Sequence, residues 1–551
     1  MIRLTELKLP LDHASDALPT LMAQTLGLQA QDIKHFSIFK RSFDARKAQL
    51  LQVYIVDLTL TPALEAALLA RFAAHPHIAA APDLFYHPVA QAPAVLKQRP
   101  VVVGFGPCGI FSALLLAQMG FKPIVLERGK AVRERTQDTW ALWRKNQLNP
   151  ESNVQFGEGG AGTFSDGKLY SQIKDPRHLG RKVIDEFVRA GAPADILFEA
   201  HPHIGTFKLV KVVENLRAQI IALGGEIRFQ HRVTDVKLQA DPQGLQLRGL
   251  TVHDGQTDSH YELPAEQVVL ALGHSARDTF SMLFERGVEL QAKPFSIGFR
   301  IEHPQGLIDR ARWGRHAGNA LLGAADYKLA HHAQNGRTVY SFCMCPGGTV
   351  VAATSELGRV VTNGMSQYSR NERNANAGIV VGIEPADFGG ERLSSGAVSP
   401  LAGIALQREL ESQAYVLGGS NYEAPAQLVG DFMADRPSTQ LGSVTPSYRP
   451  GVKLGSLAQA LPAYAIEAIR EALPAFGKKL KGFDMPDAVL TGVETRTSSP
   501  LRMPRGENFQ SSNVRGLYPA GEGAGYAGGI LSAGVDGIKV AEAVARAILN
   551  S

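Results

Sequence analysis

The chain has 551 residues, of which 44% are hydrophobic and 20% are charged, and its formal net charge is +5. This length exceeds what one hydrophobic core supports, so two or three domains are expected. The charge is mild for the size, and no nucleic-acid or membrane partner is expected from it. Three cysteines are too few for a disulfide framework, and no apolar run approaches the ~18 residues of a membrane span. We therefore expect a cytoplasmic protein.

Residues 1–92 are expected to form a domain of their own, because an Ala- and Pro-containing linker at 89–95 separates them from the next strand. The hydrophobic pattern predicts a strand, a helix, a hairpin, a second helix and a short last strand, at 2–9, 15–26, 33–43 with 50–60, 64–74 and near Ile78. This βαββαβ order is typical of a ferredoxin-like fold.

The predicted hairpin carries a basic segment at residues 40–47, and some RNA-binding modules share this fold. The charges of the domain nevertheless cancel, because its eight Lys and Arg residues are matched by eight Asp and Glu residues. A solvated hairpin or a protein-docking face is therefore favoured over RNA binding, which stays open as an alternative.

A dinucleotide site is predicted where the second domain begins. The buried strand 101–103 is followed by a glycine-rich turn into a helix, made of Gly104, Phe105, Gly106, Pro107, Cys108 and Gly109. These glycines let the backbone approach a pyrophosphate at the helix N-terminus. The next strand ends in Glu127, Arg128 and Gly129, and the Glu127 carboxylate is placed to accept both hydroxyls of an adenosine ribose.

A second glycine-rich segment spans residues 156–169. Its free backbone amides and hydroxyl side chains are suited to surround a diphosphate or the edge of a cofactor ring, as a nest of N–H donors does. A mobile surface loop is the alternative. The cofactor contacts expected here are Gly159, Gly160, Thr163, Ser165, Asp166, Gly167 and Lys168.

One helix and three strands of the nucleotide sheet are predicted next, at 209–223, 226–229, 233–236 and 267–272. In a dinucleotide-binding fold of this type, the backbone near Val233 meets the adenine. The last of these strands ends in a glycine turn, which adds Ala271 and Gly273 to the expected contacts. His274 follows that turn and is a candidate acid–base residue.

No second strand–GxGxxG–helix unit is found between residues 280 and 490, so no separate NAD(P)H domain is expected. Strands and helices are predicted instead at 295–301, 339–342, 350–353, 379–383, 402–415 and 457–473. They indicate a mixed α+β substrate or cap domain inserted at 286–487, with the active site in the cleft beside it.

Cys343 and Cys345 stand two residues apart, at the end of a predicted strand and before the expected Pro346–Gly348 turn. Packing cysteines are the favoured interpretation. If one thiol faces the cofactor, Cys345 is the candidate, because the turn glycines would expose it. No metal site is expected, since zinc would need two further ligands nearby.

Glu494 and Arg496 lie in a segment rich in Thr and Ser and are expected to face the cleft. An arginine there can bind an acidic substrate or an anionic intermediate, while a glutamate can hold the arginine or move a proton. A surface ion pair is the alternative.

The chain ends with a second strand–turn–helix motif, at 517–519 and from 530 to about 548. Such a return is typical of FAD proteins of the glutathione-reductase type, where it brings an acidic residue to the ribityl chain and a helix N-terminus to the flavin. It adds Gly521, Glu522, Gly528, Gly529 and Ile530 to the expected contacts and favours FAD over NAD. The predicted domains are 1–92, 98–285, 286–487 and the return at 488–551.

From about residue 98 onward, the chain resembles the uncharacterised FAD-dependent dehydrogenase family of bacteria, whose broader relatives are the HI0933-like flavoproteins. The motifs that carry this resemblance are 156–169, 343–348, 362–366 and 492–500. The resemblance implies an α/β fold, with a Rossmann-like FAD domain of the glutathione-reductase superfamily and an inserted domain, preceded by the ferredoxin-like domain. It implies no particular substrate.

The expected function is therefore an oxidoreductase with non-covalent FAD that transfers a hydride between flavin N5 and a small organic substrate. NAD(P)H bound transiently or a protein electron partner would complete the electron path. An RNA-modifying flavoprotein and a non-catalytic flavin sensor are the alternatives.

Overall fold

The computed structural model describes residues 1–44, 49–242, 244–390 and 392–550, and it divides the chain into two compact units. The first unit consists of residues 1–87 and 172–203, and the second of residues 88–171 and 204–551. Within the described ranges, no helix is long and apolar enough to cross a membrane.

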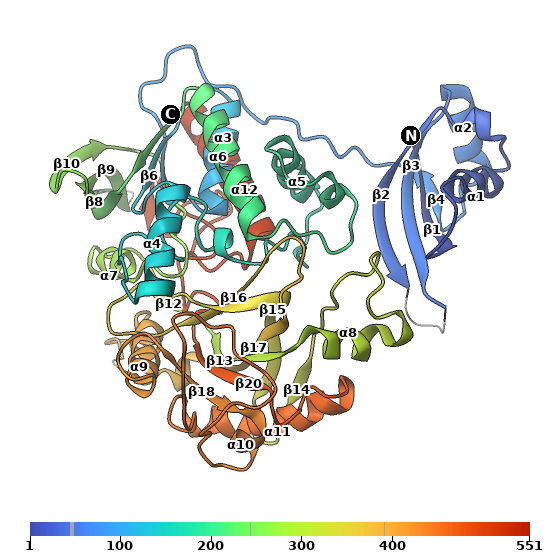
Figure 1. Ribbon diagram of the computed structural model, residues 1–551. Coiled ribbons are helices and arrows are strands. Elements are labelled where there is room, and N and C mark those ends of the chain that lie inside the picture. The colour runs from blue at the N-terminus through green and yellow to red at the C-terminus, as the bar shows by residue number, and fades with distance from the viewer. Residues whose placement is uncertain (45–48, 243, 391, 551) are drawn as a thin grey trace. The chain divides into compact units, whose positions relative to one another are not determined.

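The first unit is built on a four-stranded antiparallel sheet with the strand order β2-β3-β1-β4. Its elements, labelled in Figure 1, are β1 (Ile2–Pro10), α1 (Ala17–Leu26), β2 (His35–Asp44), β3 (Leu51–Thr59), α2 (Pro62–Arg71) and β4 (Ile78–Ala80). Leu4, Met22 and Val56 are among the side chains buried between the sheet and the helices. The βαββαβ order of the elements agrees with the prediction. Residues 45–47 of the basic segment lie outside the described residues.

A segment from later in the chain completes the first unit. Residues 172–203 contain α5 (Leu179–Arg189), and their last part pairs with the edge strand β2. The Arg41 backbone N–H donates to the Phe198 carbonyl over 2.6 Å, and the Ala200 N–H donates to the Arg41 carbonyl over 2.9 Å. This pairing covers an otherwise open sheet edge. The sequence prediction kept the segment within 98–285, whereas the structure places it in the first unit.

The second unit contains a five-stranded parallel sheet with the order β23-β11-β5-β6-β7. Its strands are β5 (Val101–Val103), β6 (Ile124–Glu127), β7 (Glu226–Phe229), β11 (Val268–Leu270) and β23 (Leu517–Pro519). The helices that lie side by side in Figure 1 are α3 (Pro107–Gln118), α6 (Thr206–Ala222) and α12 (Ile530–Leu549). A Cβ on Gly537 would lie only 2.3 Å from the Cys108 carbonyl oxygen, so α12 packs very closely on α3. The first and last glycine motifs are thus packed together.

An antiparallel meander follows β7. It consists of β8 (His231–Asp241), β9 (Gly244–Asp254) and β10 (Ser259–Pro264), with β22 (Val514–Arg515) beside β9. The prediction that residues 233–236 belong to the nucleotide sheet is wrong, because β8 pairs with β9 in this meander. Shorter elements around both sheets are α4 (Val132–Lys145), α7 (Arg277–Glu285), β12 (Gln291–Ala292) and β21 (Leu501–Arg502).

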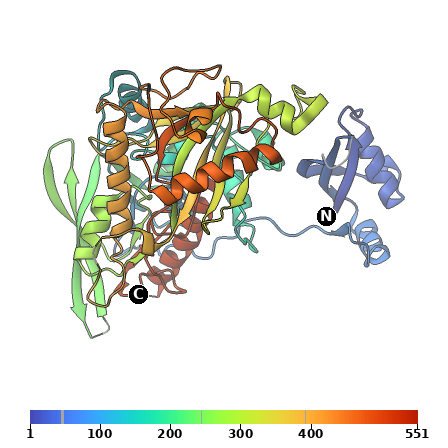
Figure 2. The same ribbon diagram turned by 90° about the horizontal axis from the view of Figure 1, so that it is seen from below.

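A large sheet with the order β14-β15-β17-β13-β20-β18-β19, and β16 beside β15, forms the rest of the second unit. Its strands are β13 (Phe295–Pro304), β14 (Ala330–His332), β15 (Thr338–Ala352), β16 (Thr362–Ser366), β17 (Asn374–Ile383), β18 (Ala424–Leu428), β19 (Val452–Leu454) and β20 (Val489–Glu494). Its helices are α8 (Gln305–Trp313), α9 (Ala402–Leu417), α10 (Val429–Met433) and α11 (Ala463–Lys479). In Figure 2, α11 runs across the strands.

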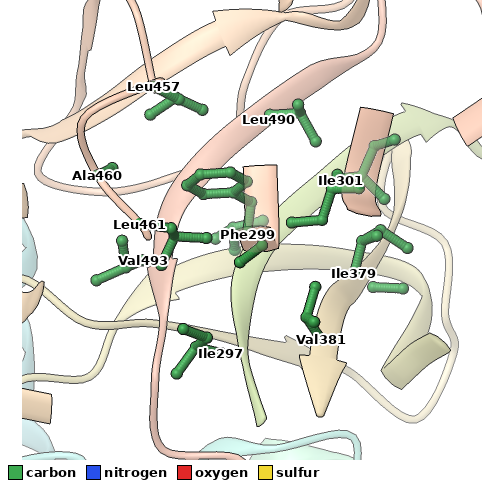
Figure 3. Packing of buried hydrophobic residues seen from close by; sticks show 14 of the residues in the cluster. Ile297, Phe299, Ile301, Ile379, Val381, Leu457, Ala460, Leu461, Leu490 and Val493 are labelled. Carbon is green, nitrogen blue, oxygen red and sulfur yellow. The ribbon is translucent and has the colours of Figure 1, made fainter. Parts of the chain in front are cut away.

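Buried apolar side chains pack closely around the central strands of this sheet. Phe299 of β13 lies against Val493 of β20 and Leu461, while Ile379 and Val381 of β17 flank it (Figure 3). Strand β20 is one of these central strands, so the large sheet includes residues on both sides of the predicted boundary at 487. The packing holds β13, β15 and β20 in place, and these strands carry Arg300, Cys343 and Glu494.

The sequence predicts two short strands, at 339–342 and 350–353, separated by a Pro-Gly-Gly turn. The structure has one strand instead, β15, which shifts its register against β17 on either side of Cys345. Gly347 has φ +42°, and a Cβ there would lie 1.7 Å from the Arg370 carbonyl oxygen. Pro346–Gly348 is therefore a bulge inside a strand, which permits a neighbouring loop to pass closely.

Candidate functional site

A cavity of about 510 Å³ lies within the second unit, where the glycine turns meet residues of β15, β16 and the end of β20. Three predicted catalytic residues, His274, Glu494 and Arg496, line it. The predicted cofactor contacts that line it are Gly104, Phe105, Gly106, Pro107, Cys108, Glu127, Arg128, Gly160, Ser165, Asp166, Gly167, Lys168, Val233, Ala271, Gly273, Glu522, Gly528, Gly529 and Ile530. Motifs up to about 400 residues apart in sequence thus converge on one cavity, as a dinucleotide-binding fold requires.

The remaining predicted contacts lie behind the cavity wall. Gly109 allows α3 to approach the preceding strand, because a Cβ there would lie 1.9 Å from the Gly104 carbonyl oxygen. Gly159 has φ +85°, and a Cβ on it would overlap the Thr163 hydroxyl at 2.1 Å. Gly521 donates its N–H to a carboxylate oxygen of Asp536 over 2.7 Å. These glycines, and Gly129, fix the conformation of the turns whose other residues line the cavity.

Glu127 organises three separate turns of the site. Its carboxylate accepts the backbone N–H groups of Phe105, Gly129 and Gly157 over 2.8, 2.8 and 2.9 Å. The side chain is 5% exposed and lines the cavity. Carboxylate oxygens have further lone pairs, so Glu127 can still accept ribose hydroxyls as predicted. The sequence did not reveal that the same carboxylate fixes the glycine turns to one another.

The N-terminus of α3 opens onto the cavity. The first intrahelical bond runs from the Ile110 N–H to the Gly106 carbonyl, so the N–H groups of Cys108 and Gly109 have no acceptor within the helix. Pro107 occupies the first helical position, where no donor is needed. Such a helix end attracts an anionic group such as a pyrophosphate.

A second helix, α12, also begins at the cavity. A Cβ on Gly528 or Gly529 would meet no atom within 4 Å, so the backbone there is open to a ligand. The preceding turn is fixed by Asp536, which lies on α12 and pairs with Arg505 over 2.6 Å. These contacts hold the helix N-terminus towards the cavity.

His274 and Glu522, both predicted site residues, lie together in the wall. The His274 Nδ1 and a Glu522 carboxylate oxygen are 3.6 Å apart. His274 comes from the turn after β11 and Glu522 from the turn after β23, which are adjacent parallel strands. An imidazole and a carboxylate in this arrangement can hold a proton or pass it on.

Lys168 and Asp166 come from the second glycine-rich segment. The Asp166 carboxylate accepts from Arg370 Nε over 3.0 Å, and Lys168 Nζ donates to the Met344 carbonyl in β15. Burial opposes the charge on Lys168, but the surrounding thiol and carboxyl groups raise its pKa above the ordinary value. The segment thus brings a cation into the cavity wall.

Arg496 lines the cavity, and its guanidinium is already engaged by protein groups. Its Nε and Nη2 donate to the two carboxylate oxygens of Glu411 over 3.1 and 2.9 Å, and its Nη1 donates to Ser275 and Ser355. Arg277 binds the same carboxylate, with its Nη2 at 2.6 Å from Glu411 Oε1. Burial opposes the charge on Glu411, but the two arginines lower its pKa far below the ordinary value.

Glu494 does not hold Arg496, one of the two roles that the sequence suggested for it. Its carboxylate is paired with Arg300 of β13, with Arg300 Nε and Nη2 at 2.8 and 3.1 Å. Burial raises the pKa of Glu494, and Arg300 and the hydroxyl of Thr362 act in the opposite direction. Glu494 lines the cavity, and its partner Arg300 is fully buried in the large sheet.

The two cysteines differ from the expectation. Cys345 is fully buried, so the idea that the turn glycines expose it is wrong; the bulge of β15 replaces that turn. Cys343 lines the cavity instead and adopts φ +41°, a backbone conformation that non-glycine residues rarely take. Sequence reasoning missed Cys343 as the cavity-facing thiol, because the register shift that reverses the two side chains is not visible locally.

Several further lining residues were also not predicted. Tyr327 and Lys328 follow α8, and Tyr170 comes directly after the second glycine-rich segment; the Lys328 Nζ lies 5.3 Å from the Tyr170 ring centre. Asn363 accepts from Arg300 Nη2 over 3.2 Å. The motif 362–366 was recognised in the sequence, so Asn363 could have been named; Tyr327 and Lys328 gave no such signal.

One family match of this chain is to an FAD-dependent family. Residues 294–497 match a family described as "FAD-dependent protein, C-terminal domain-like", and residues 1–59 match a domain of unknown function (DUF8436). Among solved structures, similarity is found to a flavocytochrome c3 fumarate reductase, with 13% identity and a TM-score of 0.35 over 84% of this chain and 79% of that one. A 3-ketosteroid-Δ4-(5α)-dehydrogenase from Rhodococcus jostii RHA1 has 13% identity and a TM-score of 0.34, over 83% of this chain and 99% of that one.

A relative from Clostridium beijerinckii, described as an uncharacterized protein, is 47% identical over 552 residues, which cover 98% of each chain. This similarity extends over the whole cavity wall and both units. The chain therefore belongs to the same family as the Clostridium beijerinckii protein, and its large-sheet region is of the FAD-dependent protein C-terminal type.

Proposed function

We propose that this protein is an oxidoreductase with non-covalently bound FAD, which moves a hydride between flavin N5 and a small organic substrate. The observation that supports this most directly is the convergence of Glu127 and the N-termini of α3 and α12 on one cavity. The match of residues 294–497 to an FAD-dependent family adds to it.

The residues present fit an FAD molecule. Glycine lets two of the turns approach each other, since a Cβ on Gly160 would lie 2.9 Å from the Gly106 Cα. At Gly528 and Gly529 a side chain would extend into open space, so the absence of side chains leaves room for FAD. The N-terminus of α3 would hold the pyrophosphate, and Glu127 the adenosine ribose. Glu522 would hold the ribityl chain.

Each of these groups has a physical task. When bound, FAD supplies a two-electron carrier. With FAD bound, the positive N-terminal end of α12 would stabilise negative charge on the reduced flavin. His274, beside Glu522, is positioned to hold or move a proton at the cavity wall. The fixed turns around Glu127 exclude water from the pyrophosphate end.

The substrate would enter beside the large sheet, where Tyr170, Tyr327 and Lys328 line the cavity. The direct role of Arg496 on the substrate stays a prediction, because its donors are largely used by Glu411, Ser275 and Ser355. Transient NAD(P)H or a protein partner as electron source is part of the proposal. The RNA-docking and sensor alternatives stay predictions without added support.

The test begins with the purified full-length protein. Denaturation should release one FAD per chain, identified by chromatography and mass; release of NAD, of FMN or of no nucleotide would contradict the proposal. An anaerobic metabolite screen, followed by loss of the oxidised-flavin band at about 450 nm, then tests turnover. A flavin that no reductant bleaches and no acceptor re-oxidises would favour the sensor alternative.

A further inference from the structure

The bulge of β15 brings two thiols together at the cavity. Cys343 lines the cavity, while Cys345 is buried directly behind it. The two thiols are hydrogen-bonded to each other, and Cys345 Sγ also lies 3.4 Å from the Cys343 carbonyl oxygen. The φ of +41° at Cys343 shows that the chain is held in an uncommon conformation at this residue. One sulfur therefore faces the cavity, and the other is buried next to it in the chain.

Two cations hold this segment of backbone. Arg300 Nη1 donates to the Cys343 carbonyl over 2.8 Å, and Lys168 Nζ donates to the carbonyl of Met344. The pKa of Cys343 is lowered to about 5, with the hydrogen bond from Cys345 as the largest cause; burial opposes the shift, and the charges of Arg300 and Lys168 contribute to it. The same hydrogen bond and burial raise the pKa of Cys345. Cys343 is thus a thiolate at neutral pH, and Cys345 keeps its proton.

A third group points to a ligand at this place. Tyr327 lines the same cavity and is 4% exposed, and its hydroxyl has no hydrogen-bond partner among the described residues. A buried hydroxyl without a partner costs free energy that a bound molecule can restore. The thiol pair and this hydroxyl therefore belong to one binding region.

We propose that Cys343 and Cys345 are a redox-active thiol pair, in which Cys343 attacks a disulfide-containing compound bound in the cavity and Cys345 resolves the product. This inference goes beyond the proposed function and holds whether or not FAD is bound. It assigns a substrate class to the cavity, namely low-molecular-weight disulfides.

The reaction is a two-step exchange. The Cys343 thiolate bonds to one sulfur of the compound, the S–S bond of the compound breaks, and the first thiolate leaves. Cys345 then gives its proton to that thiolate and bonds to Cys343, which breaks the mixed disulfide and releases the second thiolate, protonated from solvent. The protein pair is oxidised by two electrons, and the compound is reduced to two thiols.

The test exposes the full-length protein, under anaerobic conditions, to oxidised glutathione and then to acid and iodoacetamide. Peptide masses should show a Cys343–Cys345 disulfide in the wild type and free Cys108, and an excess of a small thiol should reverse it. C345S should stop at a glutathione adduct on Cys343. C343S should form neither product, because Cys345 is buried and protonated. Circular dichroism checks that each variant is folded.

Cys108 is the internal control, because it is buried and burial raises its pKa. In the native protein without oxidant, Cys343 should react with iodoacetamide at least about 10-fold faster than Cys108. Equal rates, or a wild-type protein that keeps all its thiols free with oxidised glutathione, would overturn the proposal. The FAD content of the same sample is measured separately, so failure of the thiol pair and failure of the proposed function are distinguishable.

Discussion

Arg496 and Glu411 form a bidentate ion pair in the wall of the cavity, with Nε–Oε1 and Nη2–Oε2 distances of 3.1 and 2.9 Å. Glu411 comes from α9 and Arg496 from the segment after β20, and Arg277 of α7 completes the cluster. Three elements from different parts of the chain are therefore joined by one buried carboxylate. At the cavity wall, the cluster joins α7, which follows a strand of the parallel sheet, to α9 and the segment after β20 of the large sheet.

The first prediction concerns this carboxylate. Glu411→Gln leaves two buried arginines with only Glu356, which is bonded to Arg277, as a counter-charge, so the free energy of unfolding should fall by about 3–5 kcal/mol. Urea titration followed by circular dichroism measures it. Glu409→Gln is the matched control, because Glu409 lies on the same helix and is exposed. Similar stabilities of the two variants would show that the cluster carries little energy.

A second prediction separates the two roles of Glu127. Glu127→Ala removes the acceptor of three backbone N–H groups and of the ribose, and should weaken FAD retention by a factor on the order of 10 to 100. Glu127→Gln keeps a neutral acceptor and should lose less. FAD remaining after dialysis is measured, with Glu262→Ala on the exposed β10 as control. Full retention by Glu127→Ala would refute a role in binding.

A third prediction concerns the first unit. A variant that lacks residues 1–92 should keep its FAD, because the cavity lies within the second unit. Residues 198–200, however, lose their pairing with β2, so their amide hydrogens should exchange faster with solvent. Hydrogen exchange by mass spectrometry and the absorbance of bound flavin give both results. A folded but colourless variant would make the first unit part of flavin binding.

A fourth prediction is the pH dependence of Cys343. Its folded pKa of about 5 lies below the value in the unfolded chain, so its ionisation stabilises the fold above the unfolded pKa and this contribution is lost as the pH falls towards 5. The rate of iodoacetamide reaction at Cys343 should accordingly be flat from pH 7 to 8 and fall near pH 5. In C345A, which has no donor at this position, the midpoint should move upward, because the lost hydrogen bond is the largest cause of the shift. A wild-type midpoint near 8.5, typical of a free thiol, would contradict it.

Local patterns predicted much of the fold. The strand–turn–helix motifs at 101–118 and 517–549 were recognised because glycine, buried strand and helix follow one another within a few residues. The βαββαβ order of the first unit was recognised from periodicity in the same way. Most of the expected cofactor contacts line the cavity for that reason.

Long-range relationships could not be read from the sequence. Pro346-Gly347-Gly348 has the composition of a turn, and only the passage of Arg370 against Gly347 makes it a bulge. The partners of Glu494 and Arg496 lie 194 and 85 residues away, so their pairing depends on the tertiary fold. Tyr327 carries no local signal, since its neighbours in space come from other strands.

The pairing of β2 with residues 198–200 changes how the two units are joined. The backbone passes from one unit to the other at 87–88, at 171–172 and at 203–204, so the units are connected by three segments of the chain and not by one. Two of these segments are hydrogen-bonded to each other at the cavity wall, because the Ile204 and Gly205 N–H groups donate to the carbonyls of Gly167 and Asp166. A protease that cuts only the linker at 88–98 would therefore leave residues 1–87 attached through β2 without a peptide bond, and the fragment would separate only on denaturation.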